Sequence, residues 1–483
     1  MKTLFIFTCA MLSVVFVDAE SAKRPNVLFI LADQWRAQAT GYAGDPNLSG
    51  KTPNLDRLAA ESIRFVNAIS GMPVCTPYRA SLMTGQYPQT HGLFLNDIQL
   101  PSEAKTIGEL MQAEGYATGF IGKWHLDGHG RRTYIPIERR QGFDYWKVLE
   151  CSHAYNDSYF YEGVDEKIQT WSEYDAFAQT RDAQEYIRRR SDDDNPFALF
   201  LSWGPPHNPY GSAPKRFQDL FKAEDIILRP NVRSAENQSV EQSRRELAGY
   251  YAHIVALDES IGALMSTLEE AGIADDTIVV FTSDHGDMIG SHGQQRKQRP
   301  WDESIRVPFL IRYPRAHGQQ GREVRTVLNS PDIMPTLLGL AGIAIPSQVE
   351  GRNFTSIIRG VKAPRNSSGL IACISPFGEY VRAKSGREYR GIRTERFTYV
   401  RDLQGPWLLY DNQSDPYQLR NLVNNRDKSR LRRKLDRQLN GLLKERRDAF
   451  LPGAEYIEQW GYMVNENGTV PYSNDIPADA LDD

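Results

Sequence analysis

Cysteine is scarce in this chain of 483 residues, which has only Cys9, Cys75, Cys151 and Cys373. Cys9 lies in the apolar N-terminal segment, so the rest of the chain holds three cysteines, an odd number. Small domains that depend on disulfides carry many cysteines that can pair. The sequence therefore excludes a disulfide scaffold, and at least one cysteine stands outside any pair.

An excess of charge of one sign is also lacking. The 57 Lys and Arg residues are balanced by 61 Asp and Glu residues, and the formal net charge is −4. Proteins that bind nucleic acid usually present a strongly basic face to the phosphates. The overall charge therefore gives no support for nucleic-acid binding.

Long apolar runs are absent beyond the N-terminus, so no later segment is predicted to cross a membrane. Lys2 precedes a nearly unbroken apolar stretch over residues 4–17, and Val17-Asp18-Ala19 has the small residues of a cleavage site. The stretch is short for a bilayer span, and Thr8 before Cys9 is a poor match to a lipoprotein site. We expect a signal peptide over residues 1–19 and a secreted or periplasmic protein without a membrane anchor.

Four strand-like apolar runs are present, and each ends close to ionisable residues. They cover residues 26–32, 117–121, 196–203 and 277–282. Such runs are typical of strands buried on both faces of a mostly parallel sheet. The residues that follow them should meet at the carboxyl edge of the sheet, where ligands bind in α/β folds. The alternative is that polar residues follow strands simply because loops are polar.

Helices are predicted between these strands. Thr52 is a candidate N-cap before Pro53, and residues 250–269 carry apolar side chains at helical spacing. Alternating strands and helices predict an α/β sandwich with a mostly parallel sheet over residues 24–345.

The pattern changes after residue 345. Short runs at 369–374, 389–393, 397–401 and 407–410 predict a small antiparallel sheet. A basic helix over residues 429–447 should cover this sheet with Leu431, Leu435, Leu439 and Leu442. The last thirty residues are expected to be irregular. We expect a smaller C-terminal subdomain over residues 346–483.

Cys75 begins the segment CTPYRASLMTG, in which Pro77 and the residues after it predict a helix that starts just after the cysteine. A group at a helix N-terminus meets free backbone N–H donors, which suits an anion. Arg79 adds a planar donor for an oxyanion. The alternative is an inert buried cysteine beside a surface arginine.

This segment resembles the sulfatase signature, Cys-x-Pro-x-Arg followed by Leu-x-Thr-Gly. Tyr78 differs from the serine that the family most often has at that variable position. The resemblance extends from Pro25-Asn26 to Asp411 and Asn421-Leu422. It implies an alkaline-phosphatase-like fold, in which a large α/β/α sandwich with a mixed, mostly parallel sheet carries a smaller antiparallel sheet and its helix.

The resemblance also implies a modified nucleophile. In the family, a formylglycine-generating maturation enzyme converts the cysteine, here Cys75, to Cα-formylglycine during export. One hydroxyl of the hydrated aldehyde attacks sulfur to form a sulfo-enzyme intermediate. Deprotonation of the second hydroxyl then expels sulfate and restores the aldehyde. A sulfated serine would instead be a stable ester.

Asp33, Gln34, Asp284 and His285 are candidate metal ligands at two strand ends. Two carboxylates and an amide oxygen suit a hard cation, whereas an imidazole favours a transition metal. The resemblance implies calcium bound by these four residues and by residue 75, and Mg²⁺ or Mn²⁺ remains open.

Four more residues match family motifs: Lys123 and His125 in Gly-Lys-Trp-His, His207 in Pro-His-x-Pro, and Lys297 in Arg-Lys. The resemblance implies that His125 is the base that releases sulfate, and that His207 and Lys297 surround sulfate and the leaving oxygen. His292 is a candidate substrate contact. The other histidines are assigned structural roles: His91, His129, His153, His253 and His317.

The aromatic stretch over residues 143–171 favours either core packing or a platform for sugar rings. We therefore expect an enzyme that hydrolyses sulfate esters, with a sulfated carbohydrate or polysaccharide fragment as substrate. Two alternatives stay open: an arylsulfatase of broad specificity, and a phosphonate or phosphodiester hydrolase of the same superfamily. A catalytically inactive glycan-binding protein is disfavoured because Cys75, Arg79 and the candidate metal ligands are all present.

Overall fold

The computed structural model describes residues 24–235, 238–362, 364 and 367–471. The expected signal peptide, residues 1–19, lies outside the described residues. Among the helices in the described ranges, none is both long and apolar enough to cross a membrane.

A ten-stranded sheet forms the centre of the fold, in the order β11-β2-β10-β9-β1-β8-β4-β5-β6-β7. Its middle consists of four parallel strands, which are the four apolar runs predicted from the sequence: β9 (Thr277–Ser283), β1 (Asn26–Asp33), β8 (Phe197–Pro206) and β4 (Ala117–Lys123). Phe29 of β1 lies between Phe200 of β8 and Val280 of β9. The carboxyl ends of these strands therefore share one edge.

The outer strands make the sheet mixed. On one side lie β10 (Phe309–Arg312), β2 (Ile63–Phe65) and β11 (Arg322–Val324), with β10 antiparallel to both neighbours. On the other side lie β5 (Tyr145–Leu149), parallel to β4, and then β6 (Ser158–Glu162) and β7 (Gln169–Trp171), which are antiparallel.

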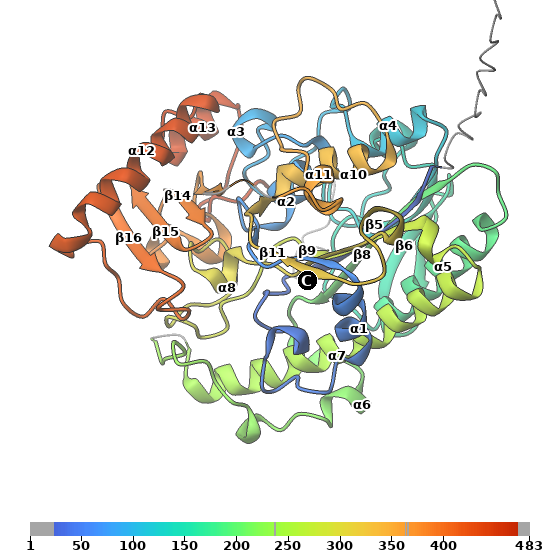
Figure 1. Ribbon diagram of the computed structural model, residues 1–483, viewed down its shortest axis with the longest axis horizontal. Coiled ribbons are helices and arrows are strands. Elements are labelled where there is room, and N and C mark those ends of the chain that lie inside the picture. Colours follow the sequence, from blue (N-terminus) through green and yellow to red (C-terminus); the bar gives the residue numbers. More distant parts are fainter. Residues whose placement is uncertain (1–23, 236–237, 363, 365–366, 472–483) are drawn as a thin grey trace, which may run out of the picture.

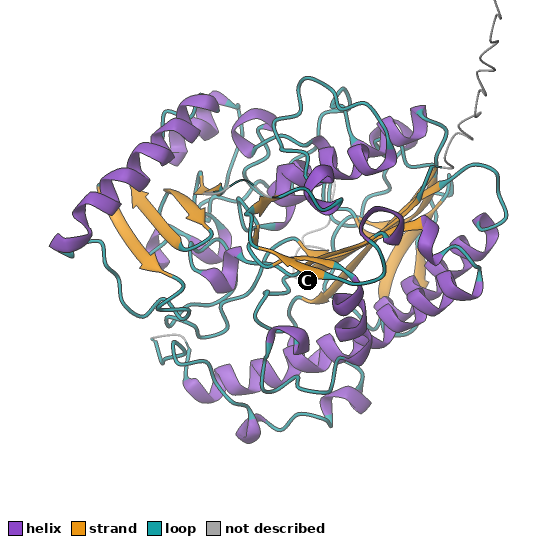
Figure 2. Cartoon of the chain, in the orientation of Figure 1, coloured by secondary structure: helices purple, strands orange, loops and turns teal. Residues whose placement is uncertain are grey.

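Helices cover both faces of the sheet, and alternate residues of β1 reach the two sides. Phe29 belongs to the apolar core beneath α2 (Cys75–Thr84), α4 (Ile107–Ala113) and α10 (Ile333–Ala341). Leu28 belongs to the core beneath α1 (Pro53–Glu61), α5 (Asp175–Arg190) and α7 (Val240–Glu270). Figures 1 and 2 show these three layers, which confirm the expected sandwich.

The helix α7 begins ten residues before the predicted start at residue 250. Its first turns are strongly polar, so they show little of the apolar spacing that marks the rest of the helix. Ser239 caps it by accepting a hydrogen bond from the backbone N–H of Gln242. Ser239 marks the start of this helix, which the apolar spacing alone could not locate.

A second, antiparallel sheet contains β13 (Ser368–Cys373), β14 (Tyr389–Thr394), β15 (Phe397–Asp402) and β16 (Gly405–Asp411), as predicted. The helix α12 (Ser429–Glu445) lies along it (Figure 1) and buries Leu435, Leu439 and Leu443. Leu442, which was expected in this row, is only partly buried, because the buried leucines follow an i, i+4 spacing.

The expectation of an irregular C-terminal end is wrong for α13 (Gly453–Gln459). This helix is too short for a periodic pattern to be read from the sequence. It is held by tertiary packing, because Tyr456 belongs to the main core.

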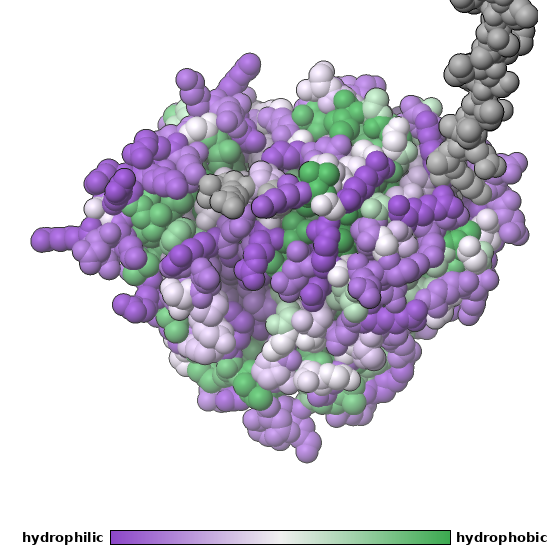
Figure 3. Space-filling view, in the orientation of Figure 1, coloured by the Kyte–Doolittle hydropathy of each residue, from purple (hydrophilic) through white to green (hydrophobic). Residues whose placement is uncertain are grey.

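The aromatic side chains of residues 143–171 do not form a platform. Trp146, Tyr155 and Phe160 are between 1% and 5% exposed. Trp146 belongs to one of the two apolar cores beside the sheet, and Tyr155 and Phe160 belong to the other, so core packing explains this stretch. On the face drawn in Figure 3, hydrophilic residues cover most of the surface and apolar ones lie in separate groups.

Candidate active site

The strand ends meet as expected. Asp33 ends β1, Lys123 ends β4, His207 follows β8 and Asp284 follows β9. Because these strands are adjacent and parallel, their ends bring carboxylates, a lysine and a histidine to one place.

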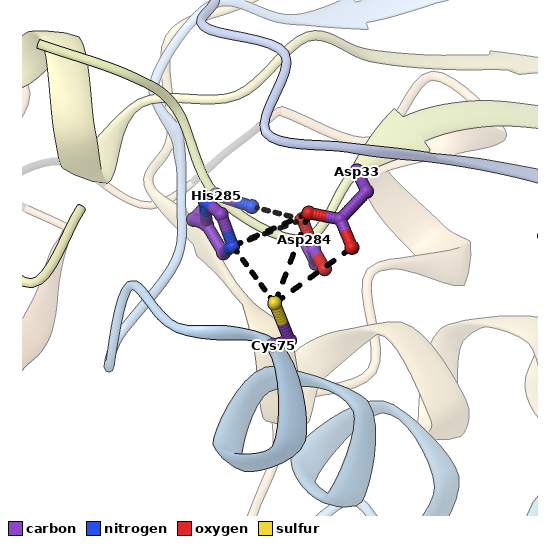
Figure 4. A group of neighbouring side chains, drawn as sticks. All are labelled: Asp33, Cys75, Asp284 and His285. Carbon is purple, nitrogen blue, oxygen red and sulfur yellow. Dashed lines mark hydrogen bonds and ion pairs between the residues drawn. The ribbon is translucent and has the colours of Figure 1, made fainter. Parts of the chain in front are cut away.

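Cys75 lies at the centre of this group, at the first residue of α2 and 1% exposed. Its Sγ is 3.3 Å from His285 Nε2, 3.3 Å from Lys297 Nζ and 3.7 Å from the nearer carboxylate oxygen of Asp33. Figure 4 shows the thiol pointing from the start of the helix toward Asp33, Asp284 and His285. The helix start predicted beside Cys75 is thus observed.

Arg79 lies one turn further along α2 and is 1% exposed. Its Nη1 donates to the Lys123 carbonyl at 2.7 Å and to Ser202 Oγ at 2.8 Å, and its Nη2 is 3.2 Å from Asp284 and 3.4 Å from Asp33. The sequence suggested an oxyanion donor. In the structure, the guanidinium is directed at the two carboxylates and holds them in place.

Asp33, Cys75, Asp284 and His285 form a buried group whose ligand atoms all lie within 4.8 Å of one another. Gln34 is part of the same site, since its backbone N–H donates to Asp284 Oδ1 at 3.0 Å and its Nε2 donates to Asp287 Oδ2 at 2.6 Å.

Gln34 Oε1 is buried and has no hydrogen-bond partner among the described residues. A buried amide oxygen without a partner is costly unless a cation or water binds it. With two carboxylates beside it, the donor set fits a hard cation such as Ca²⁺ or Mg²⁺.

The two carboxylates have opposite electrostatic environments. Burial would raise the pKa of Asp33, but the charges of Lys123 and Lys297 hold it well below its ordinary value. Burial and the neighbouring charge of Asp33 raise the pKa of Asp284. One carboxylate is therefore firmly ionised, while the other needs a further positive charge to remain so.

Lys297 and His207 form a second pair beside Cys75. Lys297 Nζ is 2.9 Å from His207 Nε2, and His207 Nδ1 is 2.9 Å from the Asn208 carbonyl. The carbonyl accepts a hydrogen bond from Nδ1–H. Nε2 is therefore unprotonated and accepts a hydrogen bond from the ammonium group of Lys297. Burial and the charge of Lys297 lower the pKa of His207, and the ring is held neutral.

His125 lies on the other side of the site, directly after β4. Its Nε2 is 3.0 Å from Asp97 Oδ1. Burial opposes the charged ring, but Cys151 and the bond to Asp97 raise the pKa of His125 well above its ordinary value. Asp97 therefore fixes the orientation of a ring that can hold a proton.

These side chains open on a cavity of about 330 Å³. Five of the predicted site residues line it: Cys75, Lys123, His125, His207 and Lys297. His292 is not among the lining residues. Its ring stacks on Trp301 at 5.0 Å and is 3.1 Å from Asn231 Nδ2, so its contacts give it a packing role.

Several polar residues of this cavity were not predicted from the sequence, among them Asp97, Cys151 and His153. His153 stacks on His207 with 4.3 Å between ring centres and an angle of 6°. Cys151 and His153 follow β5, which is parallel to β4. The strand-end rule would have found them, had residues 145–149 been recognised as a strand.

Several site residues have left-handed backbone conformations, which cost energy for residues other than glycine. They are Gln34 at φ 69°, Asp97 at 64°, His125 at 58°, and Arg296 and Gln298 at 58° and 68° on either side of Lys297. Such conformations persist where the surrounding structure enforces them, as functional sites commonly do.

Comparison with known proteins agrees with this geometry. The family described as Sulfatase matches residues 25–343, and the family described as N-sulphoglucosamine sulphohydrolase, C-terminal, matches residues 290–445. The "Ulvan-active sulfatase" of Formosa agariphila is 46% identical over 93% of this chain and 87% of its own length. The "Endo-4-O-sulfatase" of Bacteroides thetaiotaomicron is 30% identical over 88% of this chain and 93% of its own length.

A solved structure shows the same fold. It is that of yidJ from Bacteroides fragilis, described as a sulfatase, with a TM-score of 0.81 and 29% identity over 91% of this chain and 98% of its own. The first family match alone covers well over half of the sequence. The chain belongs to the sulfatase family and is a sulfuric ester hydrolase.

Proposed function

We propose that the chain removes sulfate from a sulfated carbohydrate, with residue 75, converted from cysteine to Cα-formylglycine, as the nucleophile. One observation carries the proposal: Cys75 Sγ lies at a helix start between the ammonium group of Lys297, at 3.3 Å, and the buried ligand group of Asp33, Asp284 and His285. A nucleophile at this position has a cationic group beside it, and this group attracts an anionic ester.

The lysines have the position to neutralise the ester. Lys123 Nζ and Lys297 Nζ are 4.0 Å and 3.3 Å from Cys75 Sγ, and burial around them strengthens their attraction for an anion. Lys297 also reaches His207 Nε2 at 2.9 Å. We assign this pair to the leaving oxygen, which needs a proton as its bond to sulfur breaks.

His125 is assigned to the second proton transfer. Asp97 holds its Nε2, and its Nδ1 is buried without a hydrogen-bond partner among the described residues, in a ring that lines the cavity. This arrangement leaves Nδ1 to take the proton of the second hydroxyl of the hydrated aldehyde. Loss of that proton lets sulfate leave by elimination.

The metal is assigned to Asp33, Gln34, Asp284 and His285, together with residue 75. Calcium fits the oxygen ligands best, with Mg²⁺ and Mn²⁺ as alternatives. A bound cation supplies positive charge next to the sulfate oxygens and favours the ionised form of the hydrated aldehyde.

The substrate class is supported by the cavity and by the relatives. Most residues that line the cavity are polar or charged, and they include Asn96, Arg131 and Asn208. Relatives are named as acting on ulvan, as an endo-4-O-sulfatase and as an N-acetylglucosamine-6-O-sulfatase. We infer a sulfated glycan as substrate and, from the N-terminal sequence, an exported enzyme matured by a formylglycine-generating enzyme.

Mass spectrometry of the peptide that contains Cys75, paired with assays on sulfated oligosaccharides, tests this proposal. We expect the aldehyde or its hydrate in active protein, and Cys75→Ala should lose at least 1000-fold in kcat, as expected for loss of a nucleophile. An unmodified thiol in fully active protein contradicts the proposed nucleophile.

Matched sulfate, phosphate and phosphonate esters of the same alcohol, together with simple aryl sulfates, test the substrate class. We expect the sulfated oligosaccharides to react with the highest kcat/KM. A preference for phosphodiesters or phosphonates would contradict the sulfate assignment. Equal rates on all aryl sulfates would instead show an arylsulfatase of broad specificity.

A further inference from the structure

Cys151 is a free cysteine that the proposed reaction does not use. It follows β5 and lines the cavity together with His125 and Lys123. Its backbone is fixed, because its carbonyl accepts a hydrogen bond from Tyr159 Oη at 3.1 Å. The thiol is therefore held in the same space that receives the ester.

The neighbours of Cys151 are those of a reactive thiol. His125 lines the cavity together with Cys151, and its Nε2 is bonded to Asp97 while its Nδ1 is buried without a hydrogen-bond partner among the described residues. A thiol that shares a cavity with an imidazole, a lysine and an arginine lies among groups that favour the thiolate. Burial opposes ionisation, but His125, Lys123 and Arg131 lower the pKa of Cys151 to about 6.

The two other described cysteines differ from Cys151. Cys75 is the residue that maturation consumes. Cys373 lies on β13 in the core of the second sheet, away from the cavity, and burial raises its pKa to about 12. In the mature protein, Cys151 is thus the described thiol that combines a cavity position with cationic neighbours.

The charge of the cavity wall should also favour one class of reagent over another. Lys123, Lys297 and Arg131 line it, and these three cations outnumber the two carboxylates of the wall, which belong to Asp97 and Glu379. Positive walls raise the local concentration of anions. A small anionic electrophile should therefore reach Cys151 faster than a neutral one of the same size.

We propose that Cys151 is a second modification site of this protein, at which small anionic electrophiles attach covalently and close the cavity to sulfate esters. With iodoacetate as the probe, the Cys151 sulfur attacks the methylene carbon and a sulfur–carbon bond forms. The carbon–iodine bond breaks, and iodide leaves with the electron pair. The proton of the thiol passes to His125 or to solvent.

The test measures alkylation of the purified full chain by iodoacetate and by iodoacetamide, with each cysteine peptide followed by mass spectrometry. We expect Cys151 to react before Cys373. Relative to N-acetylcysteine in the same buffer, we expect the iodoacetate-to-iodoacetamide rate ratio to be raised about 10-fold, the lower end of electrostatic steering. Added inorganic sulfate and raised salt should each reduce this ratio.

The Cys75→Ala variant separates this proposal from the proposed function, because it has neither thiol nor aldehyde at residue 75. Cys151 should be alkylated in it as readily as in the wild type, whether or not any activity is present. The same result is expected for Cys373→Ala.

Activity gives a second readout. Each protein is compared with its own untreated sample, so that a changed starting rate does not matter. Wild type and Cys373→Ala should lose activity in step with labelling at Cys151, whereas Cys151→Ala should keep its fraction. Alkylation of Cys373 first, an unchanged reagent ratio, or equal inactivation of Cys151→Ala would each overturn the proposal.

Discussion

At the residue scale, the site depends on paired charges that are each unstable alone. Asp33 and Asp284 are both 0% exposed, and a single buried carboxylate without a counter-charge is strongly disfavoured. Lys123 Nζ at 2.7 Å from Asp33, and Arg79 at 3.2 Å from Asp284, supply that charge from the protein. Lys123, which we assign to the sulfate ester, therefore also serves as a counter-charge for a buried carboxylate.

Asp97, the partner of His125, should affect how kcat depends on pH. Asp97 accepts the bond from Nε2 and helps to raise the pKa of His125, which must be unprotonated to act as a base. Asp97→Asn removes a negative charge, so the pKa of His125 falls. The acidic limb of the kcat profile should therefore move to lower pH, while kcat itself falls about 100-fold because the ring is less well oriented, within the range for general base catalysis.

The measurement is the dependence of kcat on pH for wild type and Asp97→Asn. Asp144→Asn is a suitable control, because Asp144 lies by Thr118 and Gln112 and away from the cavity. An acidic limb that stays in place in Asp97→Asn would show that another group is the base.

At the element scale, the proposed metal ligands come from elements that are far apart in sequence. Asp33 is on β1, Cys75 begins α2, and Asp284 and His285 follow β9. A cation bound there joins two strand ends to a helix. Removal of the cation should therefore lower both the stability of the fold and the rate of the reaction.

Chelation tests this. With free metal at 100 times its Kd, binding stabilises the fold by ~2.7 kcal/mol, so EDTA should lower Tm as well as activity. Calcium should restore both. Gln34→Ala, which removes the unpartnered Oε1, should need more calcium for the same recovery, whereas Gln38→Ala on the following loop should not. An unchanged Tm after complete metal removal, confirmed by elemental analysis, would show that the metal does not join these elements.

Some strands could be predicted from the sequence, and others could not. Long apolar runs such as residues 26–32 predicted the central strands correctly, because burial on both faces requires continuous hydrophobicity. The strand β5 was missed, since aromatic side chains and lysine interrupt its pattern. Cys151 and His153, which follow β5, were missed for the same reason. The partners of Arg79 could not be predicted, because they come from β4, β8 and β1 and from the residue that follows β9.

At the scale of the whole molecule, a buried ion pair joins the second sheet to the main sheet. Arg393 of β14 makes two bonds to Asp302, with both N–O distances 3.1 Å and side chains 2% and 4% exposed. Asp302 begins α8 (Asp302–Ile305), which leads into β10. This pair therefore links the two sheets through their charges.

Breaking the pair should destabilise the whole molecule. Removing one partner of a buried pair leaves the other charge uncompensated, which costs about 3–5 kcal/mol, whereas an exposed pair contributes at most about 1 kcal/mol. Arg393→Ala should thus lower the free energy of unfolding far more than Lys215→Ala, whose pair with Asp219 is 84% and 60% exposed. Chemical denaturation of the three proteins measures the difference.

The pair of Arg393 and Asp302 should also make the stability of the protein depend on pH. Burial would raise the pKa of Asp302, but Arg393 and Arg306 lower it below its ordinary value. A carboxylate with a lowered pKa in the folded state contributes stability above its unfolded pKa and loses it as pH falls through the folded one. The difference in stability between wild type and Arg393→Ala should therefore be largest near neutral pH and shrink below about pH 4, the unfolded value for Asp. A difference that stays constant down to pH 3 would show that Arg393 stabilises the junction by packing rather than by charge.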